Sequence, residues 1–575
     1  MITRLRRHVQ TFGIGVEICR TWGVRNLGRK YRRFLVLICL ATAVLGESPS
    51  IYGQTVDAVA IQKTAATARA VCVRLEAGEQ RSSGVIISAD GHILTVAHGI
   101  PEGSTSIKVV LPDQRRFTAE IVIRRPADDL ALLKINRLNA AEKLPYVRVA
   151  DVRDRDAVIE RLVAEKRLPD SVQPLNVLAA GWPARHANAH EPTIRVGAIL
   201  AEDRGRIRST CALTAGDSGG PLLTLDGLLL GIHQKIGFGS DSNLHLHISL
   251  VDSMLGRNVS PHWVSQRSDA NQLPSIRQIP DRARRSIVAY HVNVLNEGTF
   301  VSGGVRVSDE VVVCKLSSLG TAERLSCYVG SVASSSTVLI GTDRAMDLAV
   351  LQVTGLPQIQ PSSDDASETN ELSSHPDRDV IVYCGTGLSS ELASGIVTRE
   401  RFREPSIRPT LGCMLVETGS ELLVQRVFPN SCSNDAGLAP GDVLISMADH
   451  EASESKDVEA TLALFEPGDR IQIAFRRQER DLNGLGQLRH SAANLLDRVD
   501  FLDGRAGELS PRRTGFEDVF QHDANLPVSA MGGPVVTADG RLVGINIARR
   551  SREAVLAIPA DVVWQRIRSI AVPNN

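Results

Sequence analysis

Short apolar runs bounded by turn-forming residues follow one another along the chain from about residue 56 to residue 255. The runs are GVIIS, HILTVAH, SIKVVL, AEIVI, LALLKI, NVLAAG, PLLTL and LLLGIH, and Gly, Pro, Asp or Asn flanks them. Short strands with regular turn signals are typical of all-β barrels and sandwiches. We therefore predict a mainly β fold here, interrupted by one helical patch, DAVIERLVAEKRL, at residues 156–168.

The strand pattern restarts after a polar linker that contains Pro and Arg, at residues 257–285. The matching pairs are GVIISADGHILTVAH with GGVRVSDEVVVCKL, DDLALLKI with MDLAVLQV, LNVLAAGWP with DVIVYCGTG, and GGPLLTLDGLLLGI with GGPVVTADGRLVGI. Similar runs in the same order indicate an internal duplication. We call residues 54–256 the first repeat, and residues 286–404 together with 482–575 the second repeat.

Residues 1–53 carry a targeting pattern. A cluster of basic residues precedes the apolar run FLVLICLATAVLG at residues 34–46. That run is shorter than the roughly 20 residues of a membrane-spanning helix and is typical of a signal peptide. An uncleaved membrane anchor is the alternative, because no A-x-A site follows. In both cases we expect an exported protein, periplasmic or extracellular.

Charge and cysteine content narrow the functional classes. The chain has 65 Lys+Arg against 65 Asp+Glu, with 4% aromatic residues, so a nucleic-acid partner is not expected. Two of the nine cysteines, Cys19 and Cys39, lie in the targeting segment. The remainder is an odd number, which leaves at least one thiol unpaired in a monomer. Cys314 and Cys327 could close a short loop, and free buried thiols fit equally well.

The first repeat contains a candidate catalytic triad. Ser218 stands in the sequence GDSGGP, and a serine hydroxyl needs a base to become a good nucleophile. His98, at the end of TVAH, is the candidate base, and Asp129, which opens DLALLKI, is the candidate residue that orients it. Asp128 competes for that role. The chain order His, Asp, Ser is the order of the chymotrypsin type.

Two further expectations concern the surroundings of the serine. The N–H groups of Gly216 and Ser218 are the candidate oxyanion hole, because the glycines allow a sharp turn that aims both at one point. No metal and no other cofactor is predicted, because the histidines, including His245 and His247, are not at metal-ligand spacing.

Residues 57–255 resemble trypsin-like serine proteases of the bacterial HtrA type, through SSGVIISADGHILTVAH, DDLALLKI and GDSGGPLLTLDGLLLGI. The resemblance implies two β-barrels with the triad in the cleft between them. It also implies a specificity pocket lined by Ala212 and Ile236, for which we expect a small aliphatic P1 residue. Asp217 departs from the family, which usually has Asn before the serine. The helical insert at residues 154–171 has no counterpart in the family.

The second repeat lacks two members of the triad. Counting back from Asp347 by the separation between His98 and Asp129 leads to Leu316, and Met531 stands at the serine position. A thioether has no proton to give and does not attack amides. We therefore predict a pseudo-protease that has kept only Asp347.

Residues 405–481 interrupt the second repeat, and we call them the PDZ segment. LVQRVFPNSCSNDAGLAPGDVLISM, SKDVEATLALF and RIQIAFRR resemble a PDZ domain of the HtrA type. The resemblance implies that a loop of Thr410, Leu411, Gly412 and Cys413 holds the carboxylate of a partner's C-terminal peptide. A structural PDZ domain that binds nothing is the alternative.

The expected fold is thus mainly β, with two trypsin-like double β-barrel domains, the second interrupted by the PDZ segment. The expected function is that of an exported serine endopeptidase for unfolded or damaged envelope proteins, with the second repeat and the PDZ segment recruiting substrate or regulating activity. The expected partners are polypeptide substrates and C-terminal peptides, and a homo-oligomer stays open. A non-catalytic peptide-binding scaffold or stress sensor is the alternative, and a secreted digestive-type protease would show a processed activation site and several disulfides.

Overall fold

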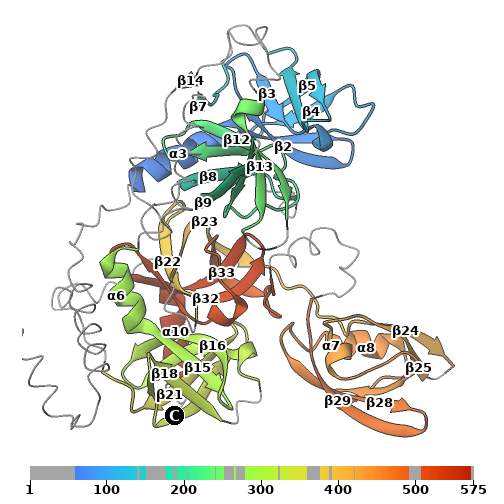
Figure 1. Ribbon diagram of the computed structural model, residues 1–575. Coiled ribbons are helices and arrows are strands. Elements are labelled where there is room, and N and C mark those ends of the chain that lie inside the picture. The colour runs from blue at the N-terminus through green and yellow to red at the C-terminus, as the bar shows by residue number, and fades with distance from the viewer. Residues whose placement is uncertain are drawn as a thin grey trace, which may run out of the picture. The chain divides into compact units, whose positions relative to one another are not determined.

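Strands dominate the regular structure in the computed structural model, and the mainly β prediction is confirmed (Figure 1). The targeting segment, the helical patch at 156–168 and most of the linker lie outside the described residues. The described residues after Gln54 form one compact unit. The structure describes residues 58–138, 143–150, 176–184, 191–203, 205–237, 239, 241–251, 265–266, 279–320, 324–358, 376–387, 392–419, 421–490 and 507–571.

The first half of the first repeat is a closed barrel with the strand order β1-β2-β3-β6-β5-β4. Its strands are β1 (Cys72–Ala77), β2 (Gln80–Ile86), β3 (His92–Thr95), β4 (Ile107–Val110), β5 (Arg116–Arg125) and β6 (Leu130–Ile135). In β6, the sequence LALLKI buries every residue except Lys134, which is half-buried. This strand lies between β3 and β5 and fixes the position of the aspartates that precede it.

The second half of the first repeat is an eight-stranded sheet with the order β11-β8-β9-β10-β13-β12-β7-β14. An additional pairing of β11 with β12 closes the strands from β8 to β13 into a ring. Helix α3 (Ala58–Val71) contacts β8, β9 and β11. The strands are β7 (Val149–Ala150), β8 (Asn176–Gly181), β9 (Thr193–Asp203), β10 (Arg206–Ser209), β11 (Pro221–Thr224), β12 (Leu229–Ile236), β13 (Asn243–His247) and β14 (Ser265–Gln266).

The second repeat has the same two-part plan. Its first part is a seven-stranded sheet with the order β19-β18-β15-β16-β17-β21-β20, and its second part is a closed barrel with the order β22-β23-β30-β33-β32-β31. The strands of the sheet are β15 (His291–Asn296), β16 (Thr299–Ser308), β17 (Val311–Lys315), β18 (Leu325–Val329), β19 (Val332–Ala333), β20 (Ser336–Asp343) and β21 (Leu348–Thr354). The strands of the barrel are β22 (Ile381–Gly385), β23 (Leu392–Glu404), β30 (Phe516–His522), β31 (Pro534–Thr537), β32 (Leu542–Ser551) and β33 (Ala554–Pro559).

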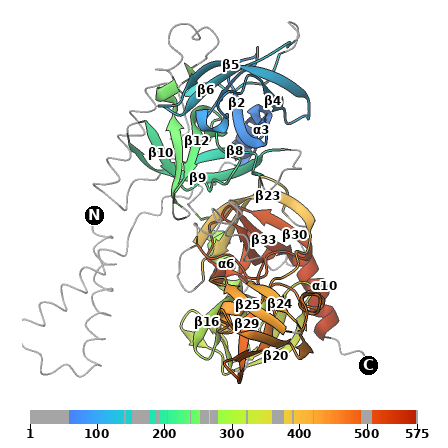
Figure 2. The same cartoon turned by 90° about the vertical axis from the view of Figure 1, so that its right-hand side faces the viewer.

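Two helices pack on the second repeat. Helix α6 (Asp281–Tyr290) contacts β16, β22 and β31, which belong to its two sheets. Helix α10 (Ala560–Ala571) continues from β33 and contacts β32, β33 and β20 (Figure 2). None of the helices in the described ranges is long and apolar enough to cross a membrane.

The PDZ segment forms a sheet of its own, with the order β24-β25-β26-β28-β29 and with β27 paired to β26. Its last strand, β29, continues past residue 481 to Gln487, so the boundary predicted from the sequence is too early. Figure 1 shows α7 and α8 beside these strands. Glu404 at the end of β23 pairs with Phe516 at the start of β30, so the segment leaves and re-enters the barrel at neighbouring residues. The elements are β24 (Cys413–Thr418), β25 (Glu421–Val427), α7 (Cys432–Asp435), β26 (Val443–Met447), β27 (His450–Glu451), α8 (Ser455–Leu462), β28 (Arg470–Arg477) and β29 (Arg480–Gln487).

The described cysteines are free thiols, and they include Cys314 and Cys327. Both side chains are buried, and burial raises the pKa of each thiol. The structure therefore has the second of the two arrangements considered above, with buried thiols and no disulfide between these residues.

Candidate active site

The structure brings His98, Asp129 and Ser218 together from three elements. His98 lies in the short turn η1 (Ala97–Gly99) that follows β3, Asp129 precedes β6, and Ser218 precedes β11. The His98 Nδ1 atom lies 2.9 Å from both carboxylate oxygens of Asp129. On the other side of the ring, His98 Nε2 lies 3.2 Å from Ser218 Oγ. This arrangement can transfer the hydroxyl proton to a ring whose orientation the carboxylate fixes.

The backbone around Asp129 holds its carboxylate in place. Asp129 has a φ of 57°, in the left-handed region that Asp tolerates better than most residues. Its carbonyl accepts a hydrogen bond from the Ala97 N–H at 3.1 Å, and its Oδ1 accepts one from the His98 N–H at 3.0 Å. Burial alone would raise the pKa of Asp129, but the hydrogen bonds from His98 and Gln234 lower it overall. The exposed Asp128 points elsewhere, with Arg125 as an ion-pair partner at 3.9 Å.

Gln234 is a further member of the site that the sequence argument did not identify. Its Nε2 donates to Asp129 Oδ2 at 3.1 Å, and its backbone carbonyl lies 3.5 Å from Ser218 Oγ. The residue touches two members of the triad from β12. The run GIHQKI predicts the strand, but nothing in it indicates which side chain turns toward Asp129.

The loop before Ser218 depends on glycine. Gly216 has a φ of 98°, and a Cβ at this position would lie 2.4 Å from the Trp182 carbonyl oxygen. The Gly216 carbonyl accepts a hydrogen bond from Ser83 Oγ at 2.8 Å. Among the described residues, the N–H groups of Gly216 and Ser218 have no hydrogen-bond acceptor. Both donors are therefore available to a ligand.

A buried ion pair supports this loop from below. Asp217 Oδ2 accepts hydrogen bonds from Arg195 Nη1 and from the Thr214 N–H, each at 2.8 Å. Neither charged side chain is more than 1% exposed. Burial raises the pKa of Asp217 to about 6, although the Arg195 charge opposes this shift. A single arginine on β9 thus holds the residue next to the serine.

The two residues predicted to line the specificity pocket connect to one buried side chain, Asn243. Ile236 pairs with Asn243 in the β12–β13 ladder. Asn243 Oδ1 accepts a hydrogen bond from the Leu213 N–H at 2.9 Å, directly after Ala212. Asn243 therefore connects the segment that carries Ala212 to the strand that ends at Ile236.

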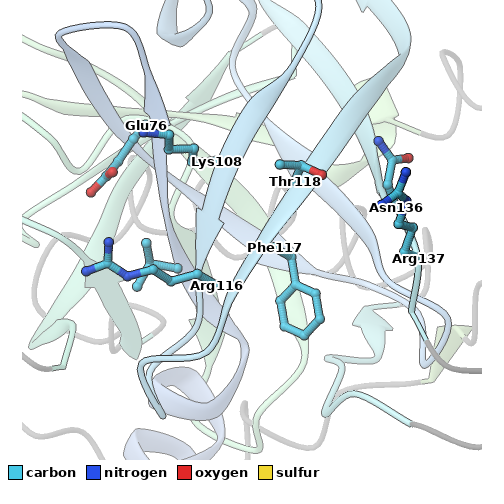
Figure 3. A pocket seen from close by; sticks show the side chains of 8 residues that line it. Glu76, Lys108, Arg116, Phe117, Thr118, Asn136 and Arg137 are labelled. Atoms are coloured by element: carbon cyan, nitrogen blue, oxygen red, sulfur yellow. The ribbon is translucent and has the colours of Figure 1, made fainter.

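A surface hollow of about 430 Å³ lies elsewhere on the first barrel (Figure 3). Its lining residues include Glu76, Phe117 and Asn136. Asn136 follows the last residue of β6, whereas Asp129 precedes the first. The hollow is therefore at the opposite end of that strand from the triad.

The structure corrects one residue of the degenerate triad, because Ser317 and not Leu316 occupies the position of His98. The Leu316 N–H donates to the Asp347 carbonyl at 2.8 Å, as the Ala97 N–H does to Asp129. The Ser317 N–H donates to Asp347 Oδ1 at 2.8 Å, as the His98 N–H does to Asp129. The segment from Ser317 to Asp347 is one residue shorter than that from His98 to Asp129, so the counted separation of 31 residues does not apply to it.

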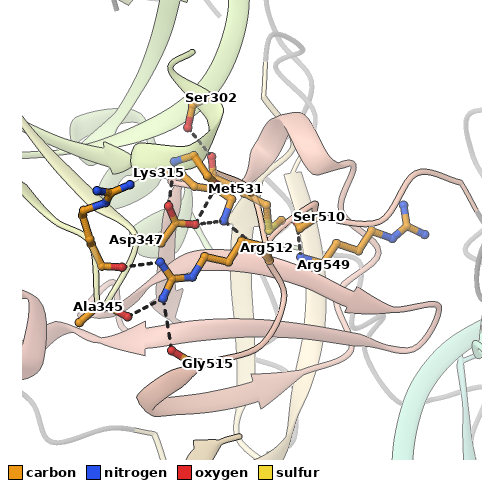
Figure 4. Close-up of polar contacts among 12 residues, drawn as sticks. Ser302, Lys315, Ala345, Asp347, Ser510, Arg512, Gly515, Met531 and Arg549 are labelled. Carbon is orange, nitrogen blue, oxygen red and sulfur yellow. Dashed lines mark hydrogen bonds and ion pairs between the residues drawn. The ribbon is translucent and has the colours of Figure 1, made fainter. Parts of the chain in front are cut away.

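Asp347 in the second repeat has an unusual buried partner (Figure 4). Its Oδ2 accepts hydrogen bonds from Lys315 Nζ and, at 2.9 Å, from Ser317 Oγ. Lys315 and Asp347 are both at most 1% exposed. The carboxylate has thus lost a histidine partner and gained a lysine.

Met531 occupies the position of Ser218. The next residue, Gly532, donates to the carbonyl of Asn546 at 2.6 Å, as Gly219 donates to the carbonyl of His233. Met531 is fully buried. The second repeat therefore presents a thioether, a serine and a lysine-paired aspartate where the first repeat has a triad.

A segment of the chain itself pairs with the end of β32 in the second repeat. In the β32–β33 ladder, Arg549 has the place that Ile236 has in the first repeat. Ser510 pairs with Arg549: its N–H donates to the Arg549 carbonyl at 3.0 Å, and its Oγ accepts from the Arg549 N–H at 2.9 Å. Arg512 then reaches the carbonyls of Arg344 and Ala345 (Figure 4).

The predicted carboxylate loop of the PDZ segment precedes the edge strand β24. The Thr410 N–H donates to the Arg489 carbonyl at 3.0 Å. The Leu411 carbonyl accepts from the Ser433 N–H and Oγ. The carbonyl of Gly412, which has a φ of 78°, accepts from Ser431 Oγ at 3.1 Å. These bonds turn the carbonyls of Leu411 and Gly412 toward the protein, before Cys413 begins the strand.

Two stretches of the chain match known protein families. Residues 82–232 match the trypsin-like peptidase domain family, and residues 409–484 match the PDZ domain family. Curated relatives from several bacteria carry the name "Probable periplasmic serine endoprotease DegP-like". The relative from Marinomonas sp. (strain MWYL1) is 36% identical over 27% of this chain and 30% of its own length. The relative from Chlamydia trachomatis serovar D is 28% identical over 32% of this chain and 34% of its own.

The third relative, from Bartonella henselae, is 23% identical over 70% of this chain and 73% of its own length. The crystal structure of the serine endoprotease from Yersinia pestis covers 74% of this chain and 97% of its own, at 16% identity and a TM-score of 0.27. The chain spans about a third of the length of the Chlamydia and Marinomonas relatives.

Proposed function

We propose that the chain, which has a trypsin-like peptidase domain and a PDZ domain, is an exported serine endopeptidase of the HtrA/Deg type. The observation that carries the proposal is the contact of His98 Nε2 with Ser218 Oγ at 3.2 Å, with Asp129 at 2.9 Å on the other side of the ring. A protein that served only as a binding scaffold would not need these three side chains in this arrangement.

The mechanism follows from the positions of these atoms. His98 Nε2 takes the proton of Ser218 Oγ as the oxygen attacks the scissile carbonyl carbon. Asp129 stabilises the imidazolium that forms, and Gln234 and the backbone N–H of His98 hold the carboxylate. The N–H groups of Gly216 and Ser218 donate to the developing oxyanion. His98 then protonates the leaving amine, and water hydrolyses the acyl-enzyme by the reverse proton path.

The test uses the full protein and its Ser218→Ala variant with a fluorophosphonate probe and unfolded casein. We expect the parent to be labelled and to cleave casein, and the variant to do neither. Ser106→Ala, which removes an exposed serine, is the matched control and keeps both activities. A parent that is neither labelled nor active would contradict the proposal and favour the non-catalytic scaffold.

We assign to the substrate an extended segment with a small aliphatic P1 residue. Ile236 and Ala212 bring no charge to the predicted pocket. The pairing of Ser510 with Arg549 in the second repeat supports an extended substrate, because Arg549 corresponds to Ile236. A peptide library with varied P1 residues checks this, and fast cleavage after Arg or Lys would overturn it.

The PDZ segment in this proposal binds C-terminal peptides. Its loop from Leu411 to Cys413 directs carbonyls inward, and β24 is an edge strand that can accept a further strand. Fluorescent peptides with a free carboxylate should bind at least about tenfold more tightly than the same peptides as C-terminal amides. Equal binding of both forms would favour a structural PDZ domain.

The proposed location is outside the cytoplasm. The relatives are named periplasmic endoproteases, and residues 1–53 have the pattern of a targeting segment. Cell fractionation of the full chain and of a chain without residues 1–53 tests this. Retention of the full chain in the cytoplasm would contradict it.

A further inference from the structure

The turn between β32 and β33 of the second repeat is unusual because it is polar and yet buried. Arg552 and Glu553 form the turn, and they are 4% and 2% exposed. Hairpin turns normally lie at the surface, and buried charges need partners. The contacts of this turn therefore show which part of the molecule covers it.

Arg552 reaches the first repeat at the hairpin between β12 and β13. Its Nη2 donates to the Gly239 carbonyl at 2.6 Å, and its Nη1 lies 3.4 Å from the Gly237 carbonyl. The same Nη2 donates to Asn243 Oδ1 at 3.1 Å. One guanidinium group thus connects the outgoing arm, the tip and the returning arm of the hairpin.

This hairpin adjoins a residue of the proposed specificity pocket, Ile236. It begins directly after Ile236, and Asn243 pairs with Ile236 across it. Asn243 Oδ1, which Arg552 contacts, also accepts the Leu213 N–H beside Ala212. Arg552 belongs to the second repeat, but its hydrogen bond to Asn243 connects it to both segments of the proposed pocket.

A second, part-buried contact joins the two repeats. Asp523 accepts hydrogen bonds from the Val196 N–H of the first repeat at 2.8 Å and from the Ile396 N–H of the second at 2.6 Å. Val196 follows Arg195, whose side chain holds Asp217 next to the serine. The carboxylate thus fastens β9 to β23 at the strand that supports the catalytic loop.

We propose that the second repeat is a built-in part of the protease's specificity pocket, with Arg552 as the positioning residue that holds the hairpin at residues 236–243. This inference rests on the proposed endopeptidase function. It gives the second repeat a role that needs no catalytic residue of its own. A charged hydrogen bond to a buried carbonyl is strong enough for its loss to alter binding by about tenfold or more.

The test compares the full protein with Arg552→Gln and with the control Arg378→Gln. Arg378 pairs with Glu191 and so also joins the two repeats, but at an exposed ion pair outside the pocket. Three readouts are taken: kcat and KM over peptides with varied P1 residues, the rate of fluorophosphonate labelling, and hydrogen exchange of residues 236–243.

We expect Arg552→Gln to reduce the ratio of kcat/KM between the best and the poorest P1 residue by about tenfold, mainly through KM. Hydrogen exchange at 236–243 should be at least about tenfold faster, and labelling should stay within about twofold of the parent. Arg378→Gln should change none of these. If Arg552→Gln does not fold by circular dichroism, Arg552→Lys, which keeps the charge but not the forked geometry, is judged by the same criteria.

The inference is overturned if exchange and P1 discrimination in the Arg552 variant equal those of the parent. It is also overturned if Arg378→Gln produces the same changes, because any damage to the contact between the repeats would then suffice. A parent that is not labelled at all contradicts the proposed function instead. In that case the exchange of residues 236–243 still decides whether Arg552 holds the hairpin.

Discussion

Two neighbouring aspartates of the first repeat have different environments, although the sequence alone leaves them as competitors. Asp129 contacts the His98 ring, and Asp128 is exposed. We expect Asp129→Asn to lower kcat/KM by roughly 10³–10⁴-fold, because the imidazolium loses its negative partner. Asp128→Asn should stay within about twofold of the parent. Initial rates on fluorescent casein measure both, and equal losses in the two variants would contradict the assignment.

A second residue-scale prediction concerns stability. Lys315 and Asp347 are buried together, so removing one charge leaves the other in a medium that solvates it poorly. Lys315→Met should destabilise the second repeat by about 3–5 kcal/mol. Because a neutral amide in place of the Asp347 carboxylate would need no cation, the double variant Lys315→Met/Asp347→Asn should recover part of that loss.

Hydrogen exchange of β17 and β21, which carry or border these residues, measures the effect. A double variant that is no more stable than Lys315→Met would show that the two charges do not depend on each other. The structural role of Asp347 would then have to lie in its hydrogen bonds to Ser317.

At the scale of elements, β12 and β13 are joined by a buried pair of neutral histidines. His233 Nε2 lies 3.1 Å from the Ala180 carbonyl, which only accepts, so the second nitrogen, Nδ1, accepts from His245 Nδ1 at 2.9 Å. His245 Nε2 then accepts from Ser209 Oγ at 2.7 Å. Each ring nitrogen has a partner, and an added proton would have no acceptor.

This pair predicts how stability depends on pH. Burial lowers the pKa of both rings, that of His245 to about 3, whereas an unfolded histidine has a pKa of about 6.5. The unfolded chain therefore binds protons first, and stability falls as the pH decreases from about 6.5 toward 3. The urea midpoint of the parent should drop between pH 7 and pH 5, and that of His245→Gln should drop less. Asp217 and Asp523 also titrate in this pH range, because burial raises the pKa of each to about 6. Both are present in the parent and in the variant, so their contributions to the pH dependence of stability cancel in the comparison.

The sequence predicts these elements better than it predicts their contacts. The apolar runs mark the strands, and their repetition indicates the duplication, because strand periodicity is local. Leu316 was the wrong equivalent of His98 because a one-residue difference in length between the two segments is invisible when residues are counted along the chain. Gln234 and Arg552 were not predicted, since each acts on a residue that is distant in the sequence.

At the scale of the whole molecule, rebuilding the second triad should not rebuild a second protease. In a Ser218→Ala background, Ser317→His with Met531→Ser supplies the missing side chains. Ser510 already pairs with the strand at Arg549, so a substrate has no free edge to join. We expect no fluorophosphonate labelling and no casein cleavage. Labelling of the serine introduced at position 531 would contradict the view that the pairing of Ser510 with Arg549 prevents reaction at this position.

The pairing of Glu404 with Phe516 has a consequence for the history of the chain. Opposite residues in an antiparallel ladder lie about 5 Å apart, so a turn of about two residues could replace everything between them. The barrel would keep its strand order, and the edge at Arg549 would lose its cover. Recombination at this one pair of codons could therefore exchange the PDZ domain while the barrel that carries it stays unchanged. A deletion of the whole stretch would likewise free the strand edge at Arg549 in a single genetic event.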